Sequence, residues 1–139
     1  APALEPQQLR GVVLAGGLYD VAAAAAMTGL PGWATGVELR ALTGSQTPLN
    51  TANVETISTI RAITADFPPT WITAADGDPL THSQAIPFAD ALTRAGVPVS
   101  ASFPSRGAQL PQDYQFLLTL DESKRAFASL INFAEAVSR

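Results

Sequence analysis

The chain contains no cysteine, a single histidine and few charged side chains, and each shortage excludes a class of protein. Without cysteine there is no disulfide framework, no thiolate zinc site and no cysteine nucleophile. The one histidine, His82, excludes sites built from several imidazoles. Charged residues make up 14% of the 139 residues, where about 25% is usual for a soluble domain. We therefore expect part of the surface to be covered by another chain or by another part of the same protein.

Basic charge and long apolar runs are also scarce. Eight Lys and Arg stand against twelve Asp and Glu, and an acidic chain without a basic patch binds nucleic acid poorly. The longest apolar run, residues 21–27, is far shorter than the ~20 residues of a membrane span, and the N-terminus does not resemble a signal peptide. The sequence predicts a soluble protein with no nucleic-acid partner and no membrane span. The lack of cysteine favours the cytoplasm, although it also fits many secreted bacterial enzymes.

Strand-like and helix-like segments alternate along the chain. The strand-like segments are residues 11–15, 70–74 and 97–103. Helices are predicted from Asp20 through the alanine run, over residues 54–63, and over the apolar stripe of residues 127–137. A further helix is predicted to follow Thr81, and Pro87 either kinks it or moves its start to about Ile86. Thr81 with Gln84 and Thr119 with Glu122 match the capping-box pattern. This order predicts an α/β fold, with a parallel sheet and flanking helices in three layers.

Three strands are few for a sheet that stands alone. The segment over residues 11–15 is apolar throughout, as in a central strand, so we expect a partner strand on each side of it. The partner is either a further segment of a larger α/β protein or a second copy of the chain in a homo-oligomer.

Three segments carry a family resemblance. They are LRGVVLAGGLYDV, PPTWITAADGDPLTHSQAIPFADALTRAGVPVSASF and LPQDYQF. Together they resemble the C-terminal half of an α/β-hydrolase of the esterase and lipase type, close to the hormone-sensitive-lipase-like branch. In that family a strand with a Gly-x-x-Asp turn precedes a cap insertion, a later strand ends in G-x-x-D-P-L, and a turn L-P-H-x-[FY] follows. The resemblance makes residues 1–139 the C-terminal part of one domain, with residues 20–53 as a cap or loop insertion.

The resemblance implies a Ser-His-Asp triad, in the chain order Ser, Asp, His. It places the triad acid at Asp78 and the histidine position at Gln112. Glutamine neither gains nor loses a proton near neutral pH, so it cannot act as a general base, although it can fill the space of the imidazole and hydrogen-bond to Asp78. The chain has no G-x-S-x-G motif, since Ser105-Arg106-Gly107 is only half of one. The nucleophile and oxyanion hole would therefore lie before Leu9.

The function that the resemblance implies is that of the C-terminal portion of a serine carboxylesterase or lipase. Its substrate would be a small acyl ester, it would need no cofactor or metal, and its partner would be the N-terminal half of the same fold or a companion chain. These 139 residues alone are then expected to be inactive. The alternative is a non-catalytic hydrolase-like module that binds a ligand or partner through the old pocket.

Several of these residues also have simpler interpretations. Asp78 fits a helix N-cap or a strand-end turn, because Asp before Pro is common there. Asp76 is predicted to be a turn residue, and a metal site of Asp66, Asp76 and Asp78 is disfavoured because no other ligands converge on it. His82 is predicted at the surface or at a helix cap. Trp33 lines an acyl pocket or anchors a loop.

Overall fold

A three-stranded parallel sheet lies at the centre of the computed structural model, which describes residues 8–27, 29, 34, 36–37, 39–41, 44, 51–104, 107 and 109–139. Strands β1 (Val12–Ala15), β2 (Thr70–Thr73) and β3 (Val99–Ser102) lie in the order β1-β2-β3. Every residue of β2 is buried, as in an inner strand. The segment 11–15, which is apolar as a central strand would be, instead forms the edge strand β1 of the described sheet. The three strands predicted from the sequence are confirmed, each slightly shorter than its segment.

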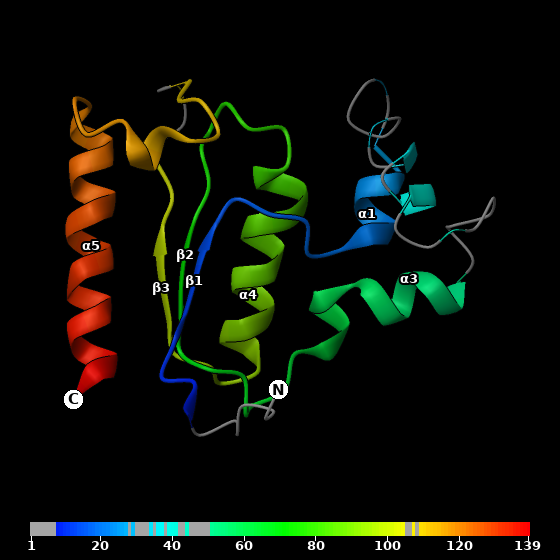
Figure 1. The fold of residues 1–139 in the computed structure, drawn as a ribbon, viewed down its shortest axis with the longest axis horizontal. Coiled ribbons are helices and arrows are strands. Elements are labelled where there is room, and N and C mark those ends of the chain that lie inside the picture. Colours follow the sequence, from blue (N-terminus) through cyan, green and yellow to red (C-terminus); the bar gives the residue numbers. More distant parts are fainter. Residues whose placement is uncertain are drawn as a thin grey trace.

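Helices cover both faces of the sheet. In chain order they are α1 (Val21–Ala25), α3 (Thr51–Ile57), the 3-10 helix η2 (Thr59–Ala62), the π-helical turn η3 (Thr81–Ala85), α4 (Ile86–Arg94), the 3-10 helix η4 (Tyr114–Phe116) and α5 (Asp121–Ser138). Figure 1 shows α4 and α5 on opposite sides of the sheet, and α1 and α3 beyond α4. The expected α/β architecture with helices flanking a parallel sheet is confirmed. None of the helices in the described ranges is long and apolar enough to cross a membrane.

Successive side chains of β2 enter two separate cores, because neighbouring residues of a strand point to opposite faces. Ile72 packs in the cluster that contains Phe88 and Leu92 of α4. Trp71 packs in the cluster that contains Ala126 of α5 and Tyr114. A third, smaller cluster of Val21, Leu39 and Val54 joins α1 to α3.

The helix boundaries follow local signals that the sequence shows. Asp20 caps α1 by accepting a hydrogen bond from the backbone N–H of Ala23 at 3.0 Å. Helix α4 begins at Ile86 and continues directly from the π-helical turn η3, in which the Ile86 N–H bonds to the Thr81 carbonyl. Pro87 therefore lies within a continuous helical segment, next to the turn where the helix departs from α geometry. Gly96 follows the end of α4 with a φ of +83°, the left-handed conformation expected after a helix.

Both predicted capping boxes are wrong, because the polar side chains find other partners. Thr81 donates its hydroxyl hydrogen to the carbonyl of Ala75, and Gln84 bonds to backbone groups 64 and 65 residues away. At α5 the N-cap position is held by Leu120, and Glu122 instead pairs with Arg125 at 2.9 Å.

The helix predicted over residues 54–63 is divided at Ser58 into α3 and η2. The Ser58 hydroxyl is buried and accepts a hydrogen bond from the backbone N–H of Val21 at 3.1 Å. This contact holds the start of α1 against the α3–η2 junction.

Candidate site at the carboxyl edge of the sheet

The three chain segments that follow the strands meet at one edge of the sheet, since the strands are parallel. Gly16 follows β1, Asp78 lies after β2, and Gln112 lies after β3. A Cβ atom added to Gly16 would lie 3.5 Å from the Gln112 amide nitrogen. The side chain of Gln112 therefore lies against the end of β1, next to the strand that leads to Asp78.

Asp78 is buried and only half satisfied. Its side chain is 6% exposed, and its Oδ1 atom accepts a hydrogen bond from the Leu80 backbone N–H at 2.9 Å. Its Oδ2 atom is buried and has no hydrogen-bond partner among the described residues. Such an atom is rare in folded proteins, because it has lost its bonds to water without replacing them. The Oδ2 atom is thus an acceptor in need of a donor.

Gln112 shares this edge with Asp78 but does not donate to it. The Gln112 side chain is exposed, and the Oδ2 atom of Asp78 is unbonded in the described part of the chain. His82, on η3, is exposed, as the sequence suggested for a surface residue. The structure thus places the proposed acid and the histidine position at the same edge, with no hydrogen bond between them.

Asp76 has a larger role than that of a turn residue. Its Oδ2 atom accepts hydrogen bonds from the N–H groups of Gly107 at 2.9 Å and Gln109 at 2.8 Å, and its Oδ1 atom accepts one from Leu110 at 2.8 Å. These contacts, which we call the Asp76 clasp, tie the segment after β3 to the segment after β2. The sequence carries no local signal for them, because the partners lie 31 to 34 residues away.

Gly77 allows the two segments of the clasp to touch. A Cβ atom at this position would lie 2.5 Å from the Leu110 carbonyl oxygen, which is too close for any side chain. Asp76 is bonded to backbone N–H groups on both of its oxygens. No group of three or more His, Cys, Asp or Glu side chains in the described ranges is arranged to hold a metal ion.

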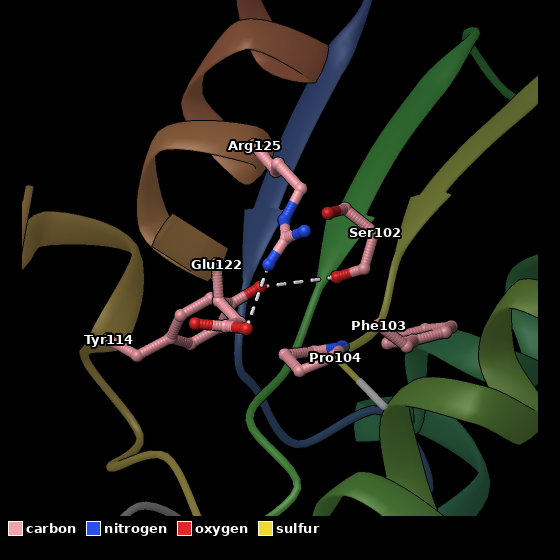
Figure 2. A pocket seen from close by; sticks show the side chains of 6 residues that line it. All are labelled: Ser102, Phe103, Pro104, Tyr114, Glu122 and Arg125. Carbon is pink, nitrogen blue, oxygen red and sulfur yellow. Dashed lines mark hydrogen bonds and ion pairs between the residues drawn. The ribbon is translucent and has the colours of Figure 1, made fainter. Parts of the chain in front are cut away.

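Tyr114 fixes the same turn at its other end. Its hydroxyl oxygen lies 2.7 Å from the Thr73 hydroxyl, and its hydroxyl group donates to the Ser102 carbonyl at 3.4 Å (Figure 2). Its own carbonyl accepts a hydrogen bond from the Ser123 hydroxyl of α5. A hollow of about 290 Å³ beside it is lined by Ser102, Phe103, Pro104, Tyr114, Glu122 and Arg125. Asp78 and Gln112 do not line this hollow. We therefore assign Tyr114 a structural role, which is to hold the turn that carries residue 112 against β2, β3 and α5.

Gln84 and Tyr19 hold the turn that leads from β1 to α1. The buried Gln84 side chain accepts hydrogen bonds from the N–H groups of Tyr19 at 2.9 Å and Asp20 at 2.7 Å, and it donates to the Asp20 carbonyl at 3.0 Å. Tyr19 stacks on Phe88 and donates its hydroxyl hydrogen to the Gly16 carbonyl at 2.9 Å. Burial raises the pKa of Tyr19 from its usual 10 to about 12. Sequence reasoning missed both roles.

Some predicted site features lie outside the described residues. They include Trp33, Ser105 and Arg106, as well as much of the cap or loop insertion over residues 20–53.

No protein-family model, curated protein or solved structure matches this chain. A functional assignment therefore depends on the residues at the carboxyl edge of the sheet.

Proposed function

We propose that this chain is the C-terminal portion of a serine carboxylic-ester hydrolase, an esterase or lipase, with Asp78 as the triad acid and residue 112 at the histidine position. The observation that carries the proposal is the buried, unpartnered Oδ2 atom of Asp78. A triad acid holds an imidazole N–H with one carboxylate oxygen and stabilises the imidazolium that forms. Asp78 offers such an oxygen, while its Oδ1 atom is fixed by the Leu80 N–H.

The turn that carries residue 112 supports the same function. It follows the next parallel strand and returns to the edge where Asp78 lies, held there by the Asp76 clasp. The nucleophile and oxyanion hole would come from the N-terminal half of the fold or from a companion chain, and the substrate would be a small acyl ester. No cofactor is needed for this chemistry. In the reaction the serine hydroxyl loses its proton to an imidazole, a step that the Gln112 amide cannot perform.

A histidine placed at position 112 tests this assignment without any assay of activity. In the Gln112→His variant of this chain, the introduced imidazole should donate to the Asp78 Oδ2 atom. Its pKa should then rise by about one pH unit or more above its usual ~6.5, because the neighbouring carboxylate favours the charged form. The measurement is an NMR titration of the two histidines, with His82 as the reference in the same spectra.

Adding Asp78→Asn to that variant should lower the pKa of the introduced histidine by most of this rise. The Asp90→Asn substitution, on the exposed side of α4, is the matched control and should leave it unchanged. If the pKa of the introduced histidine does not change on Asp78→Asn, residue 112 is not the partner of Asp78 and the proposal is overturned.

Activity is tested in the complete protein, in which the N-terminal half supplies the serine. There Gln112→His should raise the hydrolysis of a nitrophenyl ester by roughly a thousandfold, and Asp78→Asn should remove most of the gain. A complete protein with an intact serine motif that stays inactive after Gln112→His would contradict the catalytic assignment.

Gln112 itself favours a second candidate function, that of a non-catalytic module which uses the old pocket for binding. An amide at this position can fill the space of an imidazole but cannot perform its proton chemistry. The same activity assay separates the two candidates, since a binding module gains nothing from Gln112→His.

A further inference from the structure

The turn before residue 112 is fixed to the segment after β2 by one carboxylate. Asp76 accepts three backbone hydrogen bonds, from Gly107, Gln109 and Leu110, all between 2.8 and 2.9 Å long. Hydrogen bonds from backbone N–H groups to an ionised carboxylate are stronger than those between neutral groups. Asp76 and Asp78 belong to the same short turn, so whatever Asp76 holds is fixed relative to Asp78.

The backbone of the turn is shaped for this contact. Gln109 has a φ of +49°, and it is the one described residue other than glycine with a positive φ. This conformation costs free energy for a residue with a Cβ atom, so the surrounding contacts must impose it. With Gln109 in this conformation, the N–H groups of Gln109 and Leu110 both bond to the carboxylate of Asp76.

The second anchor lies on the other side of residue 112. Tyr114 is 1% exposed, and its hydroxyl contacts the Thr73 hydroxyl at the end of β2 and the Ser102 carbonyl at the end of β3. Figure 2 shows the contact with Ser102. The chain is therefore held on both sides of residue 112, by the Asp76 clasp at Gln109 and Leu110 before it and by the contacts of Tyr114 after it.

We propose that Asp76 is a positioning residue of the candidate site: the clasp sets where the side chain at position 112 lies relative to the free oxygen of Asp78. This inference rests on the proposed function, because it assigns a role toward the Asp78–112 pair. Asp76 does not touch the reacting atoms, and it acts through the backbone of residues 107, 109 and 110.

The test opens the clasp without removing any charge. In the Gln112→His background, Gln109→Pro deletes one clasp N–H and cannot adopt the positive φ, whereas Gln109→Gly keeps both. With Gln109→Gly the introduced histidine should keep its raised pKa in the NMR titration. With Gln109→Pro that rise should fall by about half or more. Asp113, the charged neighbour in sequence, is unchanged in all variants.

A thermodynamic cycle covers the case in which Gln109→Pro does not fold. The coupling between residue 112 and Asp78 is the drop in the pKa of the introduced histidine on Asp78→Asn, measured with and without Asp76→Asn. Each coupling is the difference between two pKa values measured with the same residue at position 76. The direct effect of the charge of Asp76 on the histidine therefore cancels within each coupling. We expect the coupling to fall by about half or more when Asp76 is replaced.

The outcomes separate the two proposals. A coupling that is equally large with and without the clasp would overturn the positioning role and leave the function standing. A histidine that shows no coupling to Asp78 when the clasp is intact would overturn the proposed function itself.

Discussion

At the scale of single residues, two carboxylates two positions apart have opposite surroundings. Asp76 has its oxygens bonded to three backbone N–H groups, while Asp78 keeps one buried oxygen without a partner. Asp76 is thus satisfied within the chain, whereas the open oxygen of Asp78 is buried at a free energy cost. The contrast distinguishes two residues that look alike in the sequence.

Tyr19 should make the folded chain less stable at alkaline pH. Its pKa is about 12 in the folded chain, raised by burial, whereas the unfolded chain loses the same proton near its usual value of 10. The stabilisation is therefore complete below about pH 10 and is lost as the pH rises towards about 12. In that window the free energy of unfolding should fall with pH because of this group, by at most about 1.4 kcal/mol per pH unit.

Urea unfolding at fixed pH values between 9.5 and about 12 checks this expectation. Tyr19→Phe removes the titrating group, so its stability should fall less steeply with pH, although it starts lower by about 1 kcal/mol because the Gly16 carbonyl loses its donor. Equal slopes for the two proteins would show that Tyr19 is not the group responsible.

Gln84 is expected to be the most sensitive polar residue of the β1–α1 turn. Replacing it by alanine removes three hydrogen bonds and leaves the Tyr19 and Asp20 N–H groups without an acceptor. Gln84→Ala should lower the free energy of unfolding by about 2–4 kcal/mol, measured by urea titration. The exposed Asn132→Ala, on α5, serves as a control, and a loss below about 0.5 kcal/mol at Gln84 would refute the role given to its side chain.

At the scale of elements, the turns after β2 and β3 form one unit. The Asp76 clasp joins them by hydrogen bonds, and Gly77 brings its backbone against the Leu110 carbonyl. Each turn supplies groups that the other contacts, so a change in one should affect the position of the other. The candidate site thus depends on a contact between loops on a sheet that holds them in register.

Gly77→Ala should push the two turns apart. The new methyl group would lie 2.5 Å from the Leu110 oxygen, and backbone atoms cannot move aside as a flexible side chain can. We expect a loss of about 1–3 kcal/mol in the free energy of unfolding and faster hydrogen exchange at the Gln109 and Leu110 amides. Gly36→Ala, where nothing lies within 4 Å of the added atom, is the matched control. Unchanged exchange in Gly77→Ala would contradict the contact.

At the scale of the whole molecule, β1 is an edge strand of the described sheet and carries an exposed apolar side chain. Val13 is 51% exposed although it lies opposite the buried Trp71, and Phe127 and Ile131 of α5 are 47% and 43% exposed. An apolar groove between them is lined by Val13, Ala15, Trp71, Gln115, Phe116, Phe127 and Leu130. The free edge of a strand beside an apolar surface is prone to pair with another chain.

Produced alone, the chain should therefore self-associate through the β1 edge. Val13→Lys places a charge on that edge and should shift the protein towards monomer in sedimentation at equal concentration. Ala128→Lys, on an exposed part of α5 that does not line the groove, should leave the distribution unchanged. A monodisperse, cooperatively folding monomer before any substitution would show that the edge needs no partner.

The sequence by itself determined the elements and their order. The segments 11–15, 70–74 and 97–103 became strands, Asp20 capped α1, and Gly96 followed the end of α4. These features depend on backbone conformation and on neighbours within a few residues, which a sequence shows directly. The family motif also marked Asp78 and Gln112, whose assigned roles remain proposals.

Only the tertiary structure decided which polar groups meet. The partners of Asp76 and Gln84 lie 31 to 65 residues away, so no local pattern could identify them, and the capping box expected at Gln84 was wrong for that reason. Whether an oxygen of Asp78 is bonded or open depends on how three segments converge after three strands. A polar side chain that is exposed can always hydrogen-bond to water, whereas a buried one must find a partner in the protein. Which side chains are buried is decided by the packing of the whole fold.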